Sequence, residues 1–228
     1  MREIVLDTET TGLNAAGGDR IIEIACLELV NHLPTGRHFQ RHLNPERAVS
    51  GDALAIHGLG DEFLADKPKF AEVVDELFAF IGDSPFVSHN AEFDIGFLNA
   101  ELARLERAPL PIARATDTVG IARRKFPGAP ASLDALCRRF GIDNSERTKH
   151  GALLDAELLA EVYLELVGGR QAGLELVAEI RVERVLAPGA AQAPTTGARA
   201  PRAHAPTPEE LLLHEKLVAT LVDPIWRR

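Results

Sequence analysis

The sequence is short of three things: cysteine, a surplus of positive charge, and long uninterrupted apolar runs. Its 228 residues include only two cysteines, Cys26 and Cys137, and both stand within apolar stretches. We expect both to be buried free thiols, as is usual in a reducing cytoplasm. No apolar run is long enough to cross a bilayer, and the first residues enter a predicted strand at once. The sequence therefore predicts neither a membrane span nor a signal peptide.

Positive charge is in deficit. The chain has 34 acidic residues against 25 lysines and arginines, a formal net charge of −9. A protein that holds duplex DNA on its own contacts many phosphates with Lys and Arg, so this charge argues against such a protein. A metal-dependent nuclease can nevertheless be acidic, because its metal ions neutralise the carboxylates and meet the phosphate. If the chain acts on nucleic acid, we expect a partner to deliver the substrate.

The most informative stretch is the first one with β-forming character, residues 3–12. Its apolar run predicts a buried central strand, and Gly12 marks the turn that follows. Asp7 and Glu9 lie two residues apart, so their side chains point to the same side of the strand. Neighbouring buried carboxylates repel each other and lose hydration unless a cation lies between them. The pair therefore predicts a site for Mg²⁺ or Mn²⁺; the alternative is a polar strand end.

Two later stretches add carboxylates at the expected starts of helices. One is His-Asn-x-x-Phe-Asp, ending at Asp94, and the other is His-x-x-x-x-Asp, from His150 to Asp155. Strand ends and helix starts in an α/β sheet converge on one crevice, so both acids can join the first pair. Taken alone, Asp94 could be a helix N-cap, Asp155 a solvated helix position, and His150 a surface histidine.

These three stretches, in this order, resemble the three motifs of the DEDDh exonuclease superfamily. Within it, the chain is most similar to the proofreading epsilon subunits of bacterial DNA polymerase III. The resemblance covers most of residues 2–168. The similarity to the epsilon subunits in particular rests on residues 56–68, 126–128, 132–137 and 147–163.

The resemblance implies two divalent cations, Mg²⁺ or Mn²⁺, and a role for each motif residue. Asp7 would bridge both ions, Glu9 and Asp155 would complete the ligands of one, and Asp94 would support the other. Two such ions, about 4 Å apart, stabilise the attacking and leaving oxygens of a phosphodiester. His150 would be the general base, since a neutral imidazole can accept a proton near neutral pH.

The resemblance also implies a pocket for the terminal nucleotide, centred on His57. The expected substrate-binding residues are Thr8, Thr10, Leu13, Asp52, Ile56, His57, Asn90 and Phe93. Asp52 departs from the family, which often has Glu at that place. His89 is expected to be structural. Stacking and wedging against apolar walls tolerate any base, and a mismatched end is selected because it frays.

The predicted fold is α/β. Three strands joined by short connections form an antiparallel meander, and alternating helices and strands follow it, which gives a mixed sheet. The resemblance makes this sheet ribonuclease H-like, flanked by helices and followed by a flexible C-terminal tail. Later strands are expected over residues 20–30, 37–43, 85–89 and 112–116. Helices are expected over residues 52–57, 69–81, 94–107, 117–126, 132–140, 151–167 and 209–222.

Three regions follow: an exonuclease domain over 1–169, a linker over 170–208 and a C-terminal segment over 209–228. The linker is rich in Ala, Pro, Thr and Gly and cannot bury enough surface to order itself. At its start, Gln171, Leu174 and Leu176 resemble a weak sliding-clamp peptide; the alternative is an extension of the preceding helix. The C-terminal segment resembles the part that binds the polymerase alpha subunit; the alternative is docking on its own domain. A small accessory subunit stays open as a further partner.

Three functions compete. The first is a 3′→5′ exonuclease that proofreads DNA in the bacterial replisome, removing mispaired 3′-terminal nucleotides as 5′-monophosphates. The second is an RNA-trimming relative, against which the C-terminal segment and the stretch around His57 argue. The third is a catalytically inactive scaffold subunit, against which the presence of all four acids and His150 argues.

Overall fold

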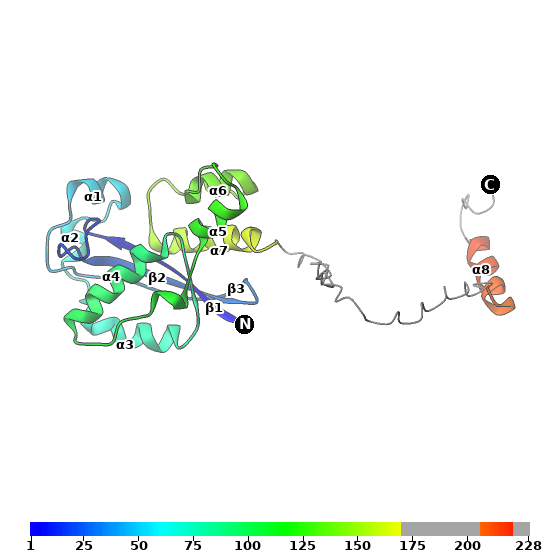
Figure 1. The fold of residues 1–228 in the computed structure, drawn as a ribbon, viewed down its shortest axis with the longest axis horizontal. Helices are drawn as coiled ribbons and strands as arrows, with labels where there is room; N and C mark the ends of the chain where they lie inside the picture. Colours follow the sequence, from blue (N-terminus) through cyan, green and yellow to red (C-terminus); the bar gives the residue numbers. More distant parts are fainter. Residues whose placement is uncertain (170–205, 221–228) are drawn as a thin grey trace, which may run out of the picture. The chain divides into compact units, whose positions relative to one another are not determined.

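The computed structural model describes residues 1–169 and 206–220 (Figure 1). The clamp-peptide residues Gln171, Leu174 and Leu176 and most of the predicted linker lie outside the described residues. The chain divides into two compact units, Met1–Leu176 and Val177–Arg228. Within the described ranges, no helix combines the length and the apolar character that crossing a membrane requires.

The first unit is built on a five-stranded mixed sheet, in the order β3-β2-β1-β4-β5. The first three strands pair antiparallel, and β4 and β5 run parallel to β1. The strands are β1 (Arg2–Thr10), β2 (Ile21–Val30), β3 (Leu33–His42), β4 (Phe86–Ser88) and β5 (Ala115–Asp117). The predicted meander and mixed sheet are confirmed.

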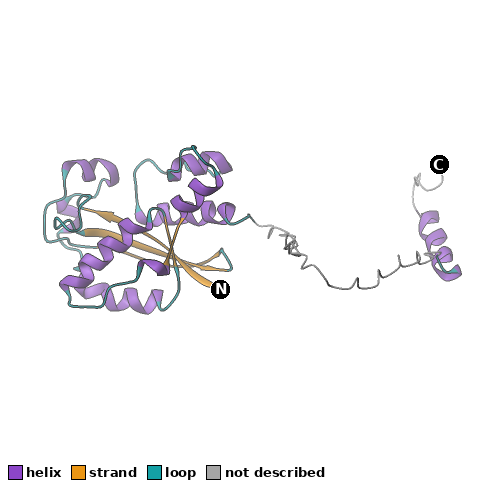
Figure 2. Cartoon of the chain, in the orientation of Figure 1, coloured by secondary structure: helices purple, strands orange, loops and turns teal. Residues whose placement is uncertain are grey.

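Helices cover both faces of this sheet (Figure 2). Ile4 and Leu6 of β1 pack with α3 and α4, while Val5, between them, packs with α5, α6 and α7. Alternation along the strand therefore sends successive side chains into two separate cores. The helices of this unit are α1 (Gly51–His57), α2 (Asp61–Leu64), α3 (Phe70–Ile81), α4 (Ala91–Arg104), α5 (Thr118–Lys125), α6 (Leu133–Phe140) and α7 (Ala152–Leu166).

The central strand extends past its parallel neighbour. β4 pairs with β1 only at Ile4 and Val5 and ends at Ser88, whose hydroxyl donates to the carbonyl of Leu6. From Asp7 to Thr10, β1 pairs with β2. The edge of β1 that β4 does not reach is where the first turns of α4 and α7 meet, one from each face of the sheet. The fold thereby brings carboxylates from both cores to one place.

Local signals explain several boundaries. Ser132 caps α6 by accepting from the amide of Ala135, and Gly141 ends it in the left-handed conformation, both as predicted. The two thiols are buried and free, which is also confirmed.

Four elements differ most from the predictions. Helix α4 is Ala91–Arg104 instead of residues 94–107, with Asn90 as its N-cap. Strand β3 begins at Leu33 instead of residue 37, because Asn31 and His32, with φ of 52° and 66°, already form a tight hairpin turn. The last strand is preceded by a 3₁₀ turn at Ile112–Arg114 and begins at Ala115. Helix α2 was not predicted, since its four residues are too few to show a helical period.

The described part of the second unit is one helix, α8 (Pro208–Thr220). It begins one residue before the predicted start. Its acidic first turn, Glu209 and Glu210, complements the positive end of the helix dipole. Four leucines on it are half-exposed or more: Leu211, Leu212, Leu213 and Leu217.

Candidate active site

A cavity of about 600 Å³ opens where β1 extends past β4. Every motif residue and every expected substrate-binding residue of the first unit lines it. These are Asp7, Thr8, Glu9, Thr10, Leu13, Asp52, Ile56, His57, Asn90, Phe93, Asp94, His150 and Asp155. The fold thus gathers residues from the whole length of the domain into one place.

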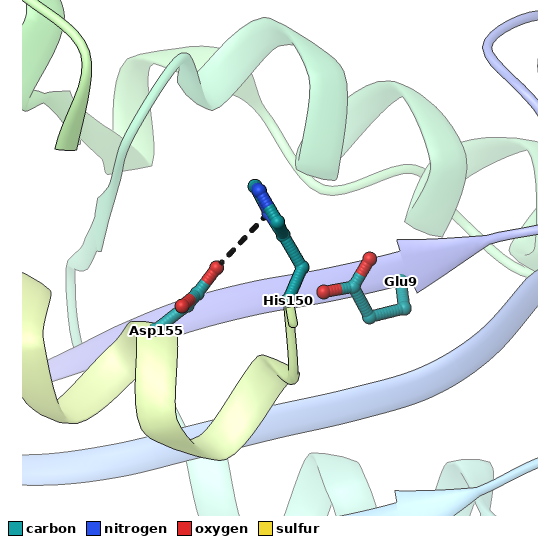
Figure 3. Close-up of side chains that lie close together, drawn as sticks. All are labelled: Glu9, His150 and Asp155. Carbon is teal, nitrogen blue, oxygen red and sulfur yellow. Dashed lines mark ion pairs between the residues drawn. The ribbon is translucent and has the colours of Figure 1, made fainter. Parts of the chain in front are cut away.

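Two motif acids and the motif histidine form a compact group. Glu9 on β1, His150 just before α7, and Asp155 in the first turn of α7 each offer a ligand atom, and these atoms lie within 4.8 Å of one another (Figure 3). Two oxygens and an imidazole nitrogen at this spacing can hold a divalent cation. Asp155 is 3% exposed, so the alternative of a solvated helix position is wrong.

Asp94 reaches the site from the opposite face of the sheet. Its Oδ1 accepts a hydrogen bond of 2.7 Å from the hydroxyl of Thr8, and both side chains are buried. Helix α4 begins at Ala91, after Asn90 in the left-handed conformation. Asp94 therefore lies inside the first turn, and the alternative that it is the N-cap is wrong.

Electrostatics indicate that the site has too much negative charge for the protein alone. Burial, and then the charges of Asp94 and Asp155, raise the pKa of Asp7 well above its usual value. Burial, and then Asp155, raise the pKa of Glu9 to about 7, and burial raises the pKa of Asp94 to about 7. Each of these carboxyl groups is hard to ionise where it stands. A divalent cation would remove this penalty, so the residues present fit a metal site.

His150 is held by its backbone as well as by its ring. Its N–H donates to the carbonyl of Ile56 at 3.2 Å, and its Nδ1 lies 3.4 Å from Oδ2 of Asp155. The hydrogen bond to Asp155 raises the pKa of this imidazole. The ring itself is half-exposed and faces the cavity, so it remains accessible to a water molecule or a substrate. Position and basicity both suit a general base.

Arg147 also lines the cavity, and sequence reasoning missed it. Its Nε and Nη2 donate to the two oxygens of Asp155, each at 2.6 Å, and its Nη1 donates to Asp134 at 2.7 Å. Burial alone would raise the pKa of Asp155, but these bonds and His150 hold it below its usual value. Asp155 is therefore kept ionised and oriented. The one signal in the sequence was an arginine three residues before the motif histidine.

The expected nucleotide pocket adjoins the acids. His57 is 6% exposed, and its Nδ1 accepts from the amide of Leu59 at 3.0 Å, which leaves the ring proton on Nε2. Burial lowers the pKa of His57, so the ring is neutral. Ile56 and Leu13 are 47% and 84% exposed. Both therefore offer apolar surface that a nucleotide base could cover. The hydroxyl of Thr10, which also lines the cavity, donates to the carbonyl of Gly12 at 2.6 Å.

Comparison with known proteins agrees with this geometry. A family model described as an exonuclease matches residues 4–163. DNA polymerase III subunit epsilon of Rickettsia felis is 48% identical over 225 residues, 97% of each chain. The epsilon subunit of Escherichia coli is 52% identical over 177 residues, 74% of this chain and 72% of that protein. The chain belongs to the DNA polymerase III epsilon family of exonucleases.

A solved structure supports the same assignment. Exonuclease X in complex with 5′ overhanging duplex DNA is 26% identical, with a TM-score of 0.55, over 72% of this chain and 90% of that one. The ribonuclease H-like fold predicted from the sequence is confirmed. Exonucleases of this family use divalent metal ions, in agreement with the acidic cluster around Glu9.

Removing metal should make the stability of the protein depend on pH. An acid whose pKa is higher in the folded than in the unfolded protein stabilises the fold at low pH. That stability is lost as pH rises through the folded value, here about 7 for Glu9 and Asp94. In a chelating buffer, we expect the thermal unfolding midpoint to fall between about pH 5 and about pH 8.

Mg²⁺ at about 100 times its dissociation constant should raise that midpoint by about 5–10 °C at the higher pH, and by less at the lower pH. Differential scanning calorimetry measures both effects. Equal stabilisation at the two pH values would contradict the assignment of these acids to a metal site.

Proposed function

We infer that the chain is a proofreading 3′→5′ exonuclease that removes mispaired 3′-terminal nucleotides from DNA, as the epsilon subunit of a bacterial polymerase III. The observation that carries this is the meeting of Asp7, Glu9, Asp94, Asp155 and His150 in one cavity, beside a pocket walled by apolar side chains. Membership of the epsilon family supports a role beside a DNA polymerase. The acids and the histidine in the cavity support hydrolysis of a phosphodiester. A cytoplasmic replisome is the setting that goes with this function.

Each residue has a proposed part in the reaction. Asp7, Glu9, Asp94 and Asp155 would hold two divalent cations, Mg²⁺ or Mn²⁺, which supply charge stabilisation to the attacking and leaving oxygens of the phosphodiester. His150 accepts a proton from the attacking water. Water oxygen bonds to the terminal phosphorus as the bond to the 3′ oxygen of the preceding nucleotide breaks. The products are a nucleoside 5′-monophosphate and a strand one residue shorter.

The terminal nucleotide is proposed to lie between Leu13, Ile56 and Phe93, with His57 and Asn90 at its polar edges. The ring of Phe93 packs against the ring of Phe97, with centroids 4.7 Å apart. Asp52, in the first turn of α1, lies at the rim of the cavity. Apolar walls do not read base identity, so selection falls on ends that unpair easily.

A release assay tests the function directly. The purified chain, with Mg²⁺ or Mn²⁺, is given 5′-labelled DNA with a matched or a mismatched 3′ end, and RNA of the same sequence. We expect stepwise shortening from the 3′ end, faster on the mismatch, with nucleoside 5′-monophosphates as products. Shortening of RNA in preference to DNA would favour an RNA-trimming enzyme, and no shortening of either would favour an inactive scaffold.

The remaining regions are proposed to join the nuclease to the replisome. Residues 1–169 would form the exonuclease domain, 170–208 the linker that carries the clamp peptide, and 209–228 the segment that binds the polymerase alpha subunit. On α8, Leu213 and Leu217 are one helical turn apart and 61% and 60% exposed, which leaves an apolar surface for a partner.

Two double variants of the full chain should separate these contacts. Leu213→Asp with Leu217→Asp should abolish co-elution with the polymerase alpha subunit, because charge would enter an apolar interface. Gln171→Ala with Leu174→Ala should weaken binding to the sliding clamp. Size-exclusion chromatography with each partner measures both effects.

Each double variant is the control for the other, and both should retain wild-type release from single-stranded DNA. The clamp measurement should also be made with polymerase present, because tethering raises the effective concentration of a weak peptide. Polymerase binding that survives the α8 substitutions would place that interface on the nuclease domain.

A further inference from the structure

Glu23 is a buried carboxylate that lies next to the site without lining the cavity. It is on β2, directly across from Glu9 of β1, and is 3% exposed. Its Oε1 accepts from the side-chain amide of Gln40 at 2.7 Å and lies 3.5 Å from Nε2 of His42. Its Oε2 accepts from the backbone N–H of Ala152 at 3.1 Å. The residue therefore links the sheet to the first residue of α7.

Helix α7 has no side-chain hydrogen bond from its own N-cap residue. The N-cap of α7 is Gly151, which has no side chain to accept from the first-turn amides. Those amides need acceptors, and a carboxylate is favoured there by the helix dipole as well. Glu23, distant in sequence, takes the place of the missing local cap. Gln40, which donates to its other oxygen, fixes the direction in which the carboxylate points.

Both sides of Gly151 are held in this way. The N–H of His150 donates to the carbonyl of Ile56, and the N–H of Ala152 donates to Glu23. A glycine between two anchored residues loses the conformational freedom it would otherwise have. The backbone that carries the imidazole of His150 is thus fixed from α1 on one side and from β2 on the other.

The arrangement also has an electrostatic cost. Glu23 adds a second carboxylate beside Glu9, in a site that already has four acids. A neutral side chain at this position would relieve that repulsion. Any favourable contribution of Glu23 to the site must therefore come from its hydrogen bond to α7. A neutral side chain that keeps an acceptor oxygen should make the same hydrogen bond.

We propose that Glu23 is a positioning residue of the exonuclease: by capping α7 from β2, it fixes the backbone that carries His150 and Asp155. This inference rests on the proposed function. It assigns Glu23 no contact with metal or substrate. It requires that loss of the cap lower the rate of the chemical step without weakening substrate binding.

The test compares Glu23→Ala, Glu23→Gln and a matched control, Glu28→Ala. Glu28 is on the same strand and equally buried, at 4% exposed, but its partners are Arg2, Thr35 and Arg37, at 2.6, 2.8 and 2.9 Å. Steady-state release from a mismatched DNA end should show kcat lowered about 10–100-fold in Glu23→Ala, with KM unchanged. Glu23→Gln should recover most of that rate. Glu28→Ala should lose thermal stability and keep its kcat.

Hydrogen exchange of the Ala152 amide in the metal-free protein tests the cap without any catalysis. Exchange should be faster in Glu23→Ala than in the wild type, and close to wild type in Glu23→Gln and Glu28→Ala. Unchanged exchange in Glu23→Ala, an unchanged kcat, or equal loss of kcat in Glu28→Ala would overturn the proposal, as would failure of Gln to recover the rate. Wild-type protein without any nuclease activity would overturn the proposed function instead, and the exchange measurement would still decide whether the cap exists.

Discussion

Replacing Asp7 by asparagine should lower nucleotide release by about 1,000-fold or more, and at the same time make the metal-free protein more stable. Metal ions in such a site contribute several kcal/mol to the transition state, and each 1.36 kcal/mol is tenfold in rate. The charge of Asp7 is also costly without metal, since burial and the neighbouring acids raise its pKa. Asparagine keeps the shape of the side chain and removes that charge.

Three measurements check the Asp7 prediction: initial release rates, calorimetric titration with Mn²⁺, and thermal unfolding in a chelator. The control is Asp75→Asn, because Asp75 is exposed, pairs only with Arg107 among the ion pairs of the described residues, and does not line the cavity. This control should match the wild type in rate and in Mn²⁺ affinity. Normal Mn²⁺ binding by Asp7→Asn would remove Asp7 from the metal site.

Replacing His150 by glutamine should reduce kcat by about 10²–10⁴-fold, the usual contribution of a general base. Mn²⁺ binding should survive, because Asp155 keeps its two hydrogen bonds from Arg147 when the imidazole is lost. The wild-type rate should rise with pH as the imidazole loses its proton, and this rise should be missing from the variant. Rates and Mn²⁺ titrations across a pH series measure all three.

The control for His150 is His38→Gln, an exposed histidine on β3. It should retain the wild-type rate and the wild-type pH profile. A His150→Gln variant whose rate still rises with pH in the same way would show that another group accepts the proton. Loss of Mn²⁺ binding in that variant would make His150 a ligand instead of a base.

Sequence alone could predict which residues gather in one cavity, because they fall in three short motifs that resemble those of an exonuclease superfamily. Asp7 and Glu9 follow from strand alternation, and Asp94 and Asp155 follow from helix starts at the same edge of a sheet. The meander could be predicted for a similar reason, since short connections leave few ways to pair three strands.

What the sequence could not predict depends on contacts between distant segments. Nothing local distinguishes Arg147 from other surface arginines until the fold brings Asp134 and Asp155 to its two sides. Glu23 likewise resembles Glu28, the other acidic residue of the same apolar strand, and its partner Ala152 is 129 residues away. Such pairs are set by tertiary packing, which periodicity and propensity do not encode.

The overhang of β1 past β4 has a consequence for the order in which the enzyme matures on the ribosome. Strands β1 to β3 are adjacent in sequence and can pair early, whereas α7, which carries Asp155, is the last element to be synthesised among those described for the first unit. At usual translation rates, on the order of ten seconds separates the first acid of the site from the last. During that interval the nascent chain lacks His150 and Asp155, so we expect nuclease activity to begin only after α7 has been added.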